Sequence, residues 1–199
     1  MFRNIFEERA NFYTFDKLNK ISKEYAEELG QDLVHLMEDK QLDDYKTISA
    51  CVALIKQGAS VDVRGCNRTT PLMYAAEADC CDIITVICNA NDENANTENI
   101  NARNINGWTA LMHAAHYGQK KAVKLLLSYG ADSTLKTPPI KGHMAPRTAE
   151  TIAQDRGYED IAEVIRVHRV THAFETAANQ GTTRARKVHR APSPAIRVD

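Results

Sequence analysis

The sequence predicts an all-α fold, a solenoid of stacked helix-turn-helix repeats that carry β-turn fingers. Three observations predict it. One stretch, residues 100–136, contains a turn, a short helical run, a second turn and a longer helical run. The core of that stretch recurs elsewhere in the chain at equal spacing. A single unit of this size cannot bury its own apolar face, so several copies must stack side by side.

The stretch at 100–136 is the clearest copy of the repeat. Its opening turn contains Asn104, Asn106 and Gly107, and these residue types tolerate the positive φ that tight turns need. Thr109 follows, where its hydroxyl is placed to cap the next helical run.

Both helical runs of this copy are amphipathic. The first has an apolar face with i, i+3, i+4 spacing, made of Leu111, Ala114 and Ala115, and it ends at Gly118. The second, residues 120–129, is closed by Gly130, since glycine takes the left-handed conformation without penalty. Its apolar side is expected to be buried and its lysines exposed: Ala122, Val123, Leu126 and Leu127 inward, and Lys120, Lys121 and Lys124 outward.

Further copies lie on both sides. Residues 70–76, Thr-Pro-Leu-Met-Tyr-Ala-Ala, match residues 109–115 position by position, and residues 148–153 form a weaker third copy. The spacings are equal, 109 − 70 = 39 and 148 − 109 = 39. Residues 52–62 fit the second helix and exit turn of a degenerate first repeat.

These motifs resemble the ankyrin repeat, a β-turn plus two antiparallel helices over about 33 residues with a Thr-Pro-Leu-His-x-Ala core. The resemblance covers about residues 32–167 and implies an ankyrin-type solenoid of about four repeats, with the first and last degenerate. Each spacing of 39 exceeds the usual repeat length of about 33 residues, and the additional residues fall where loops are expected, at 91–99 and 137–143. We therefore expect an N-terminal capping helix at 1–31, a repeat domain at 32–173 with repeats at about 32–63, 64–99, 100–136 and 144–173, and a basic tail at 174–199.

The N-terminal region is expected to be helical. From Thr14, apolar residues recur every three or four positions, which predicts an amphipathic helix that ends near Gly30. This helix either covers the exposed apolar end of the first repeat, as terminal repeats require, or binds a partner.

Repeat one is expected to follow directly. Residues 33–40 fit its first helix, and Asp43 or Asp44 is placed to cap its second, which runs to about Gln57.

The five cysteines predict reduced thiols. Their number is odd, the N-terminus lacks the apolar core of a signal peptide, and no C-x-x-C occurs. Cys51 and Cys88 fit buried positions of second helices. Cys80-Cys81 stands in for the Gly-His pair usual between the helices of an ankyrin repeat, and Asn91 for the closing glycine. A cytoplasmic compartment is expected, or the host cytosol for a secreted protein.

Charge is unevenly distributed along the chain. Residues 1–100 carry 10 Lys and Arg against 18 Asp and Glu, and residues 101–199 carry 15 against 8, so the halves are −8 and +7. Such asymmetry steers partners of matching polarity. No apolar run is long enough to span a membrane.

The tail from about Thr176 has no apolar periodicity and is predicted to be disordered. Its basic residues are Arg184, Arg186, Lys187, Arg190 and Arg197. The tail is either simply solvated or an arm that binds nucleic acid, acidic surfaces or membranes. Its arginine spacing is also similar to C-terminal signals on bacterial type IV secretion substrates, a group in which ankyrin proteins are frequent.

The sequence offers no catalytic motif. Phosphate loops, G-x-G-x-x-G, G-x-S-x-G and H-E-x-x-H are absent, and no cofactor is expected. His113 and His116 are three residues apart and could touch one metal ion, but no third ligand has useful spacing, so no metal site is predicted. Cys80 lacks the orienting group that a Cys-His nucleophile pair needs.

The resemblance places binding on the concave face, made by turn tips and first helices. The positions of this sequence that match the variable positions of the family are Cys66, Asn67, Thr69, Glu77 and Ala78 in repeat two, Ile105, Asn106, Trp108, His116 and Tyr117 in repeat three, and Arg147, Asp155 and Arg156 in repeat four. Tyr74 and His113, each one residue after a methionine, are expected on the same face.

Trp108 is the single tryptophan, and tryptophan and tyrosine are enriched among residues that dominate binding. It either contacts a partner or packs against the next turn. We therefore expect a monomeric, non-catalytic protein-binding scaffold or adaptor. The alternatives are a secreted bacterial effector that binds host proteins in the same way, and nucleic-acid or acidic-surface binding through the basic half. An enzyme is disfavoured because the repeats leave no room for a catalytic domain.

Overall fold

The computed structural model describes residues 22–38, 42, 44–90, 100–139 and 145–188, and side chains only up to residue 174 at the C-terminal end. Within these residues the chain is helical and contains no strand, which confirms the all-α prediction. Residues 22–38 are helical. The remaining helices are α2 (Tyr45–Lys56), the 3-10 helix η1 (Cys66–Arg68), α3 (Pro71–Glu77), α4 (Cys81–Ala90), α6 (Ala110–Tyr117), α7 (Lys120–Ser128), α8 (Ala149–Asp155) and α9 (Glu159–Val188).

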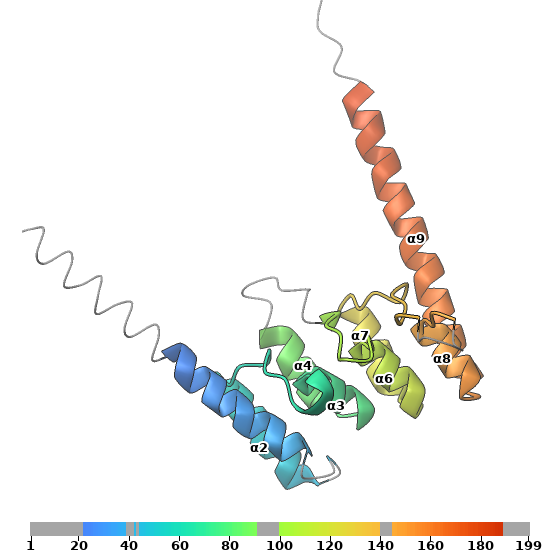
Figure 1. Ribbon diagram of the computed structural model, residues 1–199. Coiled ribbons are helices and arrows are strands. Elements are labelled where there is room, and N and C mark those ends of the chain that lie inside the picture. Colours follow the sequence, from blue (N-terminus) through green and yellow to red (C-terminus); the bar gives the residue numbers. More distant parts are fainter. Residues whose placement is uncertain (1–21, 39–41, 43, 91–99, 140–144, 189–199) are drawn as a thin grey trace, which may run out of the picture.

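The helices form two rows that run through the stack (Figure 1). Helices α3, α6 and α8 pack against one another in the row of first helices, and α4, α7 and α9 pack in the row of second helices. We call the surface formed by α3, α6, α8 and the turns before them the first-helix face. Among the described residues, the main contacts between repeats join neighbouring repeats, as expected of an ankyrin-type solenoid.

Each first helix begins at the threonine that the repeat predicts. Thr70, Thr109 and Thr148 accept hydrogen bonds from the backbone N–H three residues on, which satisfies one donor of each helix start. Asp44 likewise caps α2, which settles the choice between Asp43 and Asp44. The helix starts therefore follow from side chains that are local in sequence.

The core confirms the predicted faces. All seven inward positions of repeat three are buried, namely Leu111, Ala114, Ala115, Ala122, Val123, Leu126 and Leu127. Lys120, Lys121 and Lys124 are exposed, as expected. Cys51 and Cys88 are buried, and none of the five cysteines forms a disulfide.

Neighbouring fingers are joined by their backbones. In repeat two, Gly65 N–H donates to Thr69 O at 2.9 Å, and in repeat three Asn104 N–H donates to Trp108 O at 3.0 Å. Ile105 N–H also donates to Asn67 O at 3.0 Å, which links the two turn tips. These bonds hold the turn tips in register along the first-helix face.

The predicted helix end at Gly30 is wrong, because one helix runs continuously through residues 22–38. Gly30 is buried against the next turn, where a Cβ atom would lie 2.5 Å from Val63 Cγ2 and 2.6 Å from Ser60 O. Ser60 N–H also donates to Ala26 O at 2.8 Å. The missing side chain of Gly30 lets the helix and the turn pack closely. In the sequence alone, a glycine in this role cannot be distinguished from a glycine that ends a helix.

The turn between α3 and α4 also differs from the prediction. Asp79 has φ 54°, and it lies at the position where repeats three and four have Gly118 (φ 77°) and Gly157 (φ 82°). Asp79, rather than Cys80, therefore replaces the glycine of the repeat, in the left-handed conformation that Asp tolerates better than most residues. In the turn before α6, among Asn104, Asn106 and Gly107 only Gly107 has positive φ.

Helix α9 is longer than predicted. The sequence suggests a helix end near Thr171 and disorder from Thr176, yet the helix continues to Val188 and projects beyond the stack (Figure 1). Extending a helix that is already nucleated costs far less than starting one, and alanine, arginine and lysine favour helix in this segment. The prediction overlooked this continuity with a packed helix.

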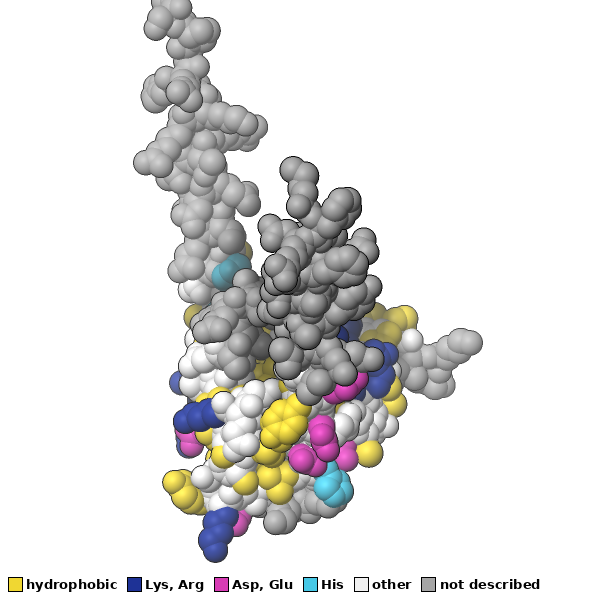
Figure 2. Space-filling model, turned by 90° about the vertical axis from the view of Figure 1, so that its left-hand side faces the viewer, with side chains coloured by type: hydrophobic (Ala, Val, Ile, Leu, Met, Phe, Trp, Pro, Cys, Tyr) yellow, Lys and Arg dark blue, Asp and Glu magenta, His cyan; other side chains and the backbone are white. Residues whose placement is uncertain are grey.

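The N-terminal end of the stack exposes hydrophobic side chains among Asp and Glu side chains (Figure 2). Helix 22–38 buries Leu33, Val34 and Met37, as a cover of the stack would, but it leaves Tyr25 56% exposed. Both predicted roles of this region therefore remain predictions. The segments 1–21, 39–41, 91–99 with Asn91, 140–144 and 189–199 lie outside the described residues, as does position 43. None of the described helices combines the length and the apolar character that a membrane span requires.

Candidate functional site

The turn before α6 positions the single tryptophan. Asn104 Oδ1 accepts from Asn106 N–H at 3.0 Å and from Trp108 N–H at 2.9 Å, so the asparagine closes the turn through its own side chain. Trp108 is half-buried and packs against the core, as the packing alternative predicts. Its ring also contacts the rings of His113 and His116 on the first-helix face.

Trp108 is the centre of an aromatic cluster on α6. Its ring meets His113 edge-on at a centroid distance of 5.4 Å and His116 at 5.0 Å, and His116 meets Tyr117 at 5.1 Å. Edge-to-face contacts at these distances are favourable. The cluster orders Trp108, His116 and Tyr117, three of the predicted binding residues, on one surface, with Tyr117 46% exposed.

His113 connects the cluster to repeat two. Its Nε2 lies 3.3 Å from Asn104 Nδ2, an amide donor, which leaves the proton on Nδ1. Nδ1 points at Glu77 Oε2 over 3.5 Å, a long contact, and it has no closer partner among the described residues. The contact with His113 lowers the pKa of Glu77, and a hydrogen bond from Tyr117 does so too, which keeps Glu77 charged.

Arg156 connects the cluster to repeat four. Its Nε lies 3.1 Å from His116 Nδ1, and its guanidinium also approaches His116 Nε2 at 2.5 Å. A neutral imidazole has a single acceptor nitrogen, so one of the two contacts is a hydrogen bond in a given tautomer. Burial and the charge of Arg156 lower the pKa of His116, and both effects favour this neutral form.

These contacts form one group, here called the aromatic cluster: Glu77 from repeat two, Trp108, His113, His116 and Tyr117 from repeat three, and Arg156 from repeat four. Sequence reasoning selected all six from separate positions of the repeat. It missed Asn104, which holds both Trp108 and His113. The sequence pattern that could have identified it is an asparagine three residues before a glycine, Asn104 and Gly107, which is typical of an Asx-type turn.

The other predicted binding residues lie elsewhere on the face. Ile105 is 57% exposed, and Asn106 and Asn67 are exposed at the turn tips. Thr69 is 7% exposed, so its side chain has almost no surface for a partner, which argues against that selection. Burial in the turn is a consequence of the Gly65–Thr69 backbone bond, which the sequence pattern does not specify.

Tyr74 is held away from the aromatic cluster. Its hydroxyl donates to Glu38 Oε1 at 2.6 Å, and the same oxygen accepts from Cys66 N–H at 2.6 Å. These bonds lower the pKa of Glu38, whereas burial and then the bond to Glu38 raise that of Tyr74. Glu38 thereby ties both the repeat-two finger and Tyr74 of α3 to the N-terminal helix, a contact that sequence reasoning did not foresee.

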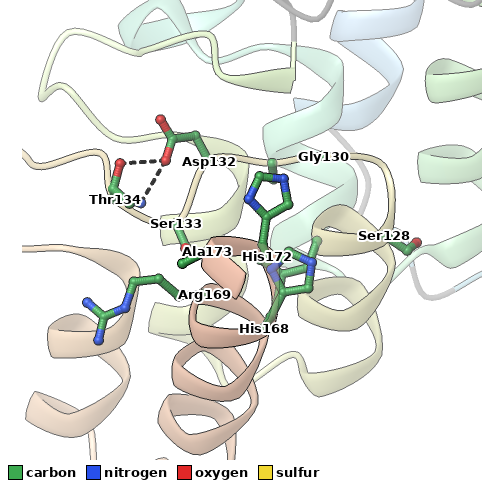
Figure 3. Close-up of a pocket in the computed structure, with 11 residues that line it drawn as sticks. Ser128, Gly130, Asp132, Ser133, Thr134, His168, Arg169, His172 and Ala173 are labelled. Carbon is green, nitrogen blue, oxygen red and sulfur yellow. Dashed lines mark hydrogen bonds between the residues drawn. The ribbon is translucent and has the colours of Figure 1, made fainter. Parts of the chain in front are cut away.

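A groove of about 620 Å³ lies on the opposite row, between the exit turn of repeat three and α9 (Figure 3). His168 and His172 stack along one wall with centroids 6.2 Å apart. Asp132 Oδ1 accepts from Thr134 N–H and Oγ1, while Arg169 extends away from the imidazoles and pairs with Glu150 at 3.1 Å. Several side chains that line the groove therefore already contact one another.

Neither surface offers a metal centre. Within the described part of the chain, no three His, Cys, Asp or Glu side chains gather closely enough to hold an ion. His116 is in contact with Arg156, a cation that disfavours a metal ion beside it. The aromatic cluster is therefore suited to contacts with another molecule's side chains, by apolar area, hydrogen bonds and charge.

Comparison with known proteins identifies the repeats. The model of a family described as "Ankyrin repeats (3 copies)" matches residues 43–137 and 94–171. Calmodulin-binding transcription activator 5 of Arabidopsis thaliana is 48% identical over 56 residues, 28% of this chain and 6% of that protein. Calmodulin-binding transcription activator CBT of Oryza sativa subsp. japonica is 39% identical over 69 residues, 35% of this chain and 7% of that protein.

The chain thus spans 6% to 7% of the length of these curated relatives. The family matches extend together over residues 43–171 of 199, more than half of the chain. Ankyrin repeats are non-catalytic modules of protein–protein interaction. By the repeated motif, the stacked helix pairs and these matches, the chain belongs to the ankyrin repeat family.

Proposed function

We propose that this chain is a scaffold or adaptor that binds a protein partner through the first-helix face, with the aromatic cluster as the main contact. The observation that carries the proposal is the convergence of six side chains from three consecutive repeats on one surface. Tyr117 and Arg156 are exposed and His116 is half-buried, so these contacts lie at the surface, outside the buried core that joins the repeats.

The composition of the cluster fits a binding surface. Tryptophan, tyrosine and arginine are the residues most enriched where binding energy concentrates. Trp108 and Tyr117 are held by ring contacts, so they lose little conformational freedom when a partner arrives. Exposed Ile105, Asn106 and Asn67 at the turn tips supply the rim of the same surface.

The alternatives stay predictions. The relatives named above are plant proteins, and the chain spans too little of them to carry over an activity or partner from their names. No contact among the described residues favours a secreted effector or nucleic-acid binding over protein binding. A cytoplasmic, reducing location and a monomeric state are part of the proposal. The location is supported by five cysteines that form no disulfide with one another.

The test is loss of binding without loss of fold. The Trp108→Ala/Tyr117→Ala double variant should weaken capture of protein partners from a cell lysate by about 2 kcal/mol or more, because such residues dominate interfaces. Quantitative mass spectrometry of the captured proteins measures this, and circular dichroism melting should show a nearly unchanged transition.

A matched control removes two exposed aromatic residues elsewhere. Tyr45 is 80% exposed on α2 and Phe174 is 71% exposed on α9. The Tyr45→Ala/Phe174→Ala variant should retain the captured proteins. Retention of capture by the Trp108/Tyr117 variant, or its loss only together with the melting transition, would refute the proposed surface and direct attention to the N-terminal helix or α9.

A further inference from the structure

The first-helix face changes charge along the stack. At its repeat-two side, Glu77 is an anion opposite His113 and Tyr117. At its repeat-four side lie Arg147 and Arg156, and the charges of both act on His116. The aromatic rings lie between the two. A partner that contacts the rings therefore meets negative charge on one side and positive charge on the other.

The two arginines differ in how they are neutralised. Arg147 Nη1 pairs with Asp155 Oδ2 at 3.4 Å. Arg156 is exposed, and among the described residues its guanidinium contacts His116 and no carboxylate. Since His116 is held neutral, the charge of Arg156 is uncompensated at the edge of the aromatic cluster.

An uncompensated guanidinium beside apolar rings selects a particular ligand. Guanidinium groups bind carboxylates through charge-assisted hydrogen bonds, which are stronger than neutral ones. The contact with His116 fixes one edge of the Arg156 fork and leaves its remaining N–H groups for an acceptor. Trp108 and Tyr117 offer the adjacent apolar area.

We infer that the partner presents an acidic peptide segment, with an Asp or Glu carboxylate that binds Arg156 next to a large apolar side chain that packs on Trp108 and Tyr117. This inference rests on the proposed function and names the chemistry of its partner. The +7 charge of residues 101–199 steers such a segment toward the C-terminal half of the stack.

The experiment uses a display library of random-sequence peptides, selected against the full chain. Selected peptides should be enriched in a carboxylate next to a large apolar residue. Affinities of fluorescently labelled peptides are then measured by polarisation. Arg156→Gln should weaken binding about ten- to a hundredfold, the effect of losing a charged hydrogen bond. The Lys124→Gln variant, which removes an exposed cation of α7, should bind as the wild type does.

A charge exchange tests the contact directly. Arg156→Glu should reject the selected peptide and bind its Asp→Lys or Glu→Lys counterpart, whereas the wild type should show the reverse preference. Unchanged melting of both Arg156 variants keeps the comparison valid. Peptides that need Trp108 and Tyr117 but lack carboxylates, or that bind Arg156→Gln normally, would overturn the acidic-segment inference and leave the proposed function intact. A selection that yields no peptide dependent on Trp108 and Tyr117 would instead overturn both.

Discussion

At the residue scale, Asp79 combines a role in the turn with a role in capping a helix of the next repeat. It adopts the left-handed conformation of the turn, φ 54°, and its Oδ1 accepts from Ala122 N–H of the next repeat at 2.8 Å. Helix α7 needs this bond, because Gln119, its N-cap residue, makes no side-chain cap of its own. Asp79 thus caps a helix of the neighbouring repeat.

Substitution of Asp79 separates these roles. Asp79→Ala should lower the free energy of unfolding by about 1–3 kcal/mol, since it combines left-handed strain with a lost cap. Asp79→Asn retains both an acceptor and tolerance of positive φ, so it should cost less than about half of that. Urea denaturation measures both. Equal losses for the two variants would show that the side-chain charge, and not the cap, is what matters.

His116 predicts a pH dependence of stability. Its pKa in the folded chain is lowered by burial and by Arg156, whereas the unfolded chain titrates near the ordinary value of about 6.5. Below that pH the unfolded state takes up a proton more readily than the folded state. The contribution of His116 to stability is therefore complete above pH ~6.5 and is lost as the pH falls toward the folded pKa.

Thermal melts at about pH 7.5 and about pH 5.5 bracket this window. The wild type should lose more melting temperature between the two than His116→Gln, which keeps a hydrogen-bond acceptor for Arg156 but does not titrate. The other six histidines, at positions 35, 113, 143, 168, 172 and 189, are unchanged in this variant and serve as the internal background. A parallel decline of the two proteins would exclude His116 as the source of the dependence.

At the scale of elements, glycine ends one helix of this chain but not another. Gly118 ends α6 in the left-handed conformation, whereas Gly30 lies inside a continuous helix. The same residue type therefore has opposite outcomes, because Gly30 is buried against Ser60 and Val63 of the following turn. Local sequence does not report such a close approach.

Helix α9 divides into a packed part and a projecting part. Ile161, Ala162 and Ile165 are buried, while Val167, Val170 and Phe174 are 51%, 45% and 71% exposed. Burial thus fades along the helix as it leaves the stack. Glu150 of α8 ties the packed part by ion pairs to Arg166 at 3.0 Å and Arg169 at 3.1 Å.

Removal of residues 176–199 should therefore reduce helical ellipticity but leave the melting temperature nearly unchanged. Ile165 is the last buried position among the described side chains, so we expect the removed segment to bury little and to contribute little to stability. Circular dichroism measures both quantities in one experiment. A fall of several degrees in the melting temperature would show that the projecting part packs on the stack.

At the scale of the whole molecule, stability depends on contacts between adjacent repeats. Helix α7 lies between α4 and α9, so it joins the N-terminal repeats to the C-terminal repeat. Leu126 is fully buried in this helix. A defect there weakens the interfaces on both sides, because coupling in a repeat array runs through nearest neighbours.

Leu126→Ala should lower the free energy of unfolding by about 2–5 kcal/mol, as truncation of a buried leucine does. It should also separate one unfolding transition into two, with the N-terminal and C-terminal repeats unfolding independently. Denaturation followed by Trp108 fluorescence, local to repeat three, and by circular dichroism, which reports the whole chain, detects the separation. The exposed Lys124→Ala on the same helix is the control. A loss below about half a kcal/mol would contradict the inward placement of Leu126.

The sequence alone determines the repeat architecture of this protein, because the determinants are local and recur. A threonine caps each of α3, α6 and α8, and small or aliphatic residues at i, i+3, i+4 spacing define the buried face of each helix. The interval of 39 residues aligns the copies. The candidate binding residues of repeats two to four also follow from their positions in the repeat. These residues occupy equivalent positions in successive repeats. When the repeats stack, equivalent positions therefore lie on the same face.

Only the tertiary structure decides which of these positions meet and which are withdrawn. Thr69 is buried in its turn, Tyr74 is drawn to Glu38, and Arg156 reaches back across the repeat boundary to His116. The tertiary structure also decides that the helix continues through Gly30 and that Asp79 caps α7. Each depends on a contact between residues far apart in the chain, and its energy exists only once neighbouring repeats have stacked, so no local pattern encodes it.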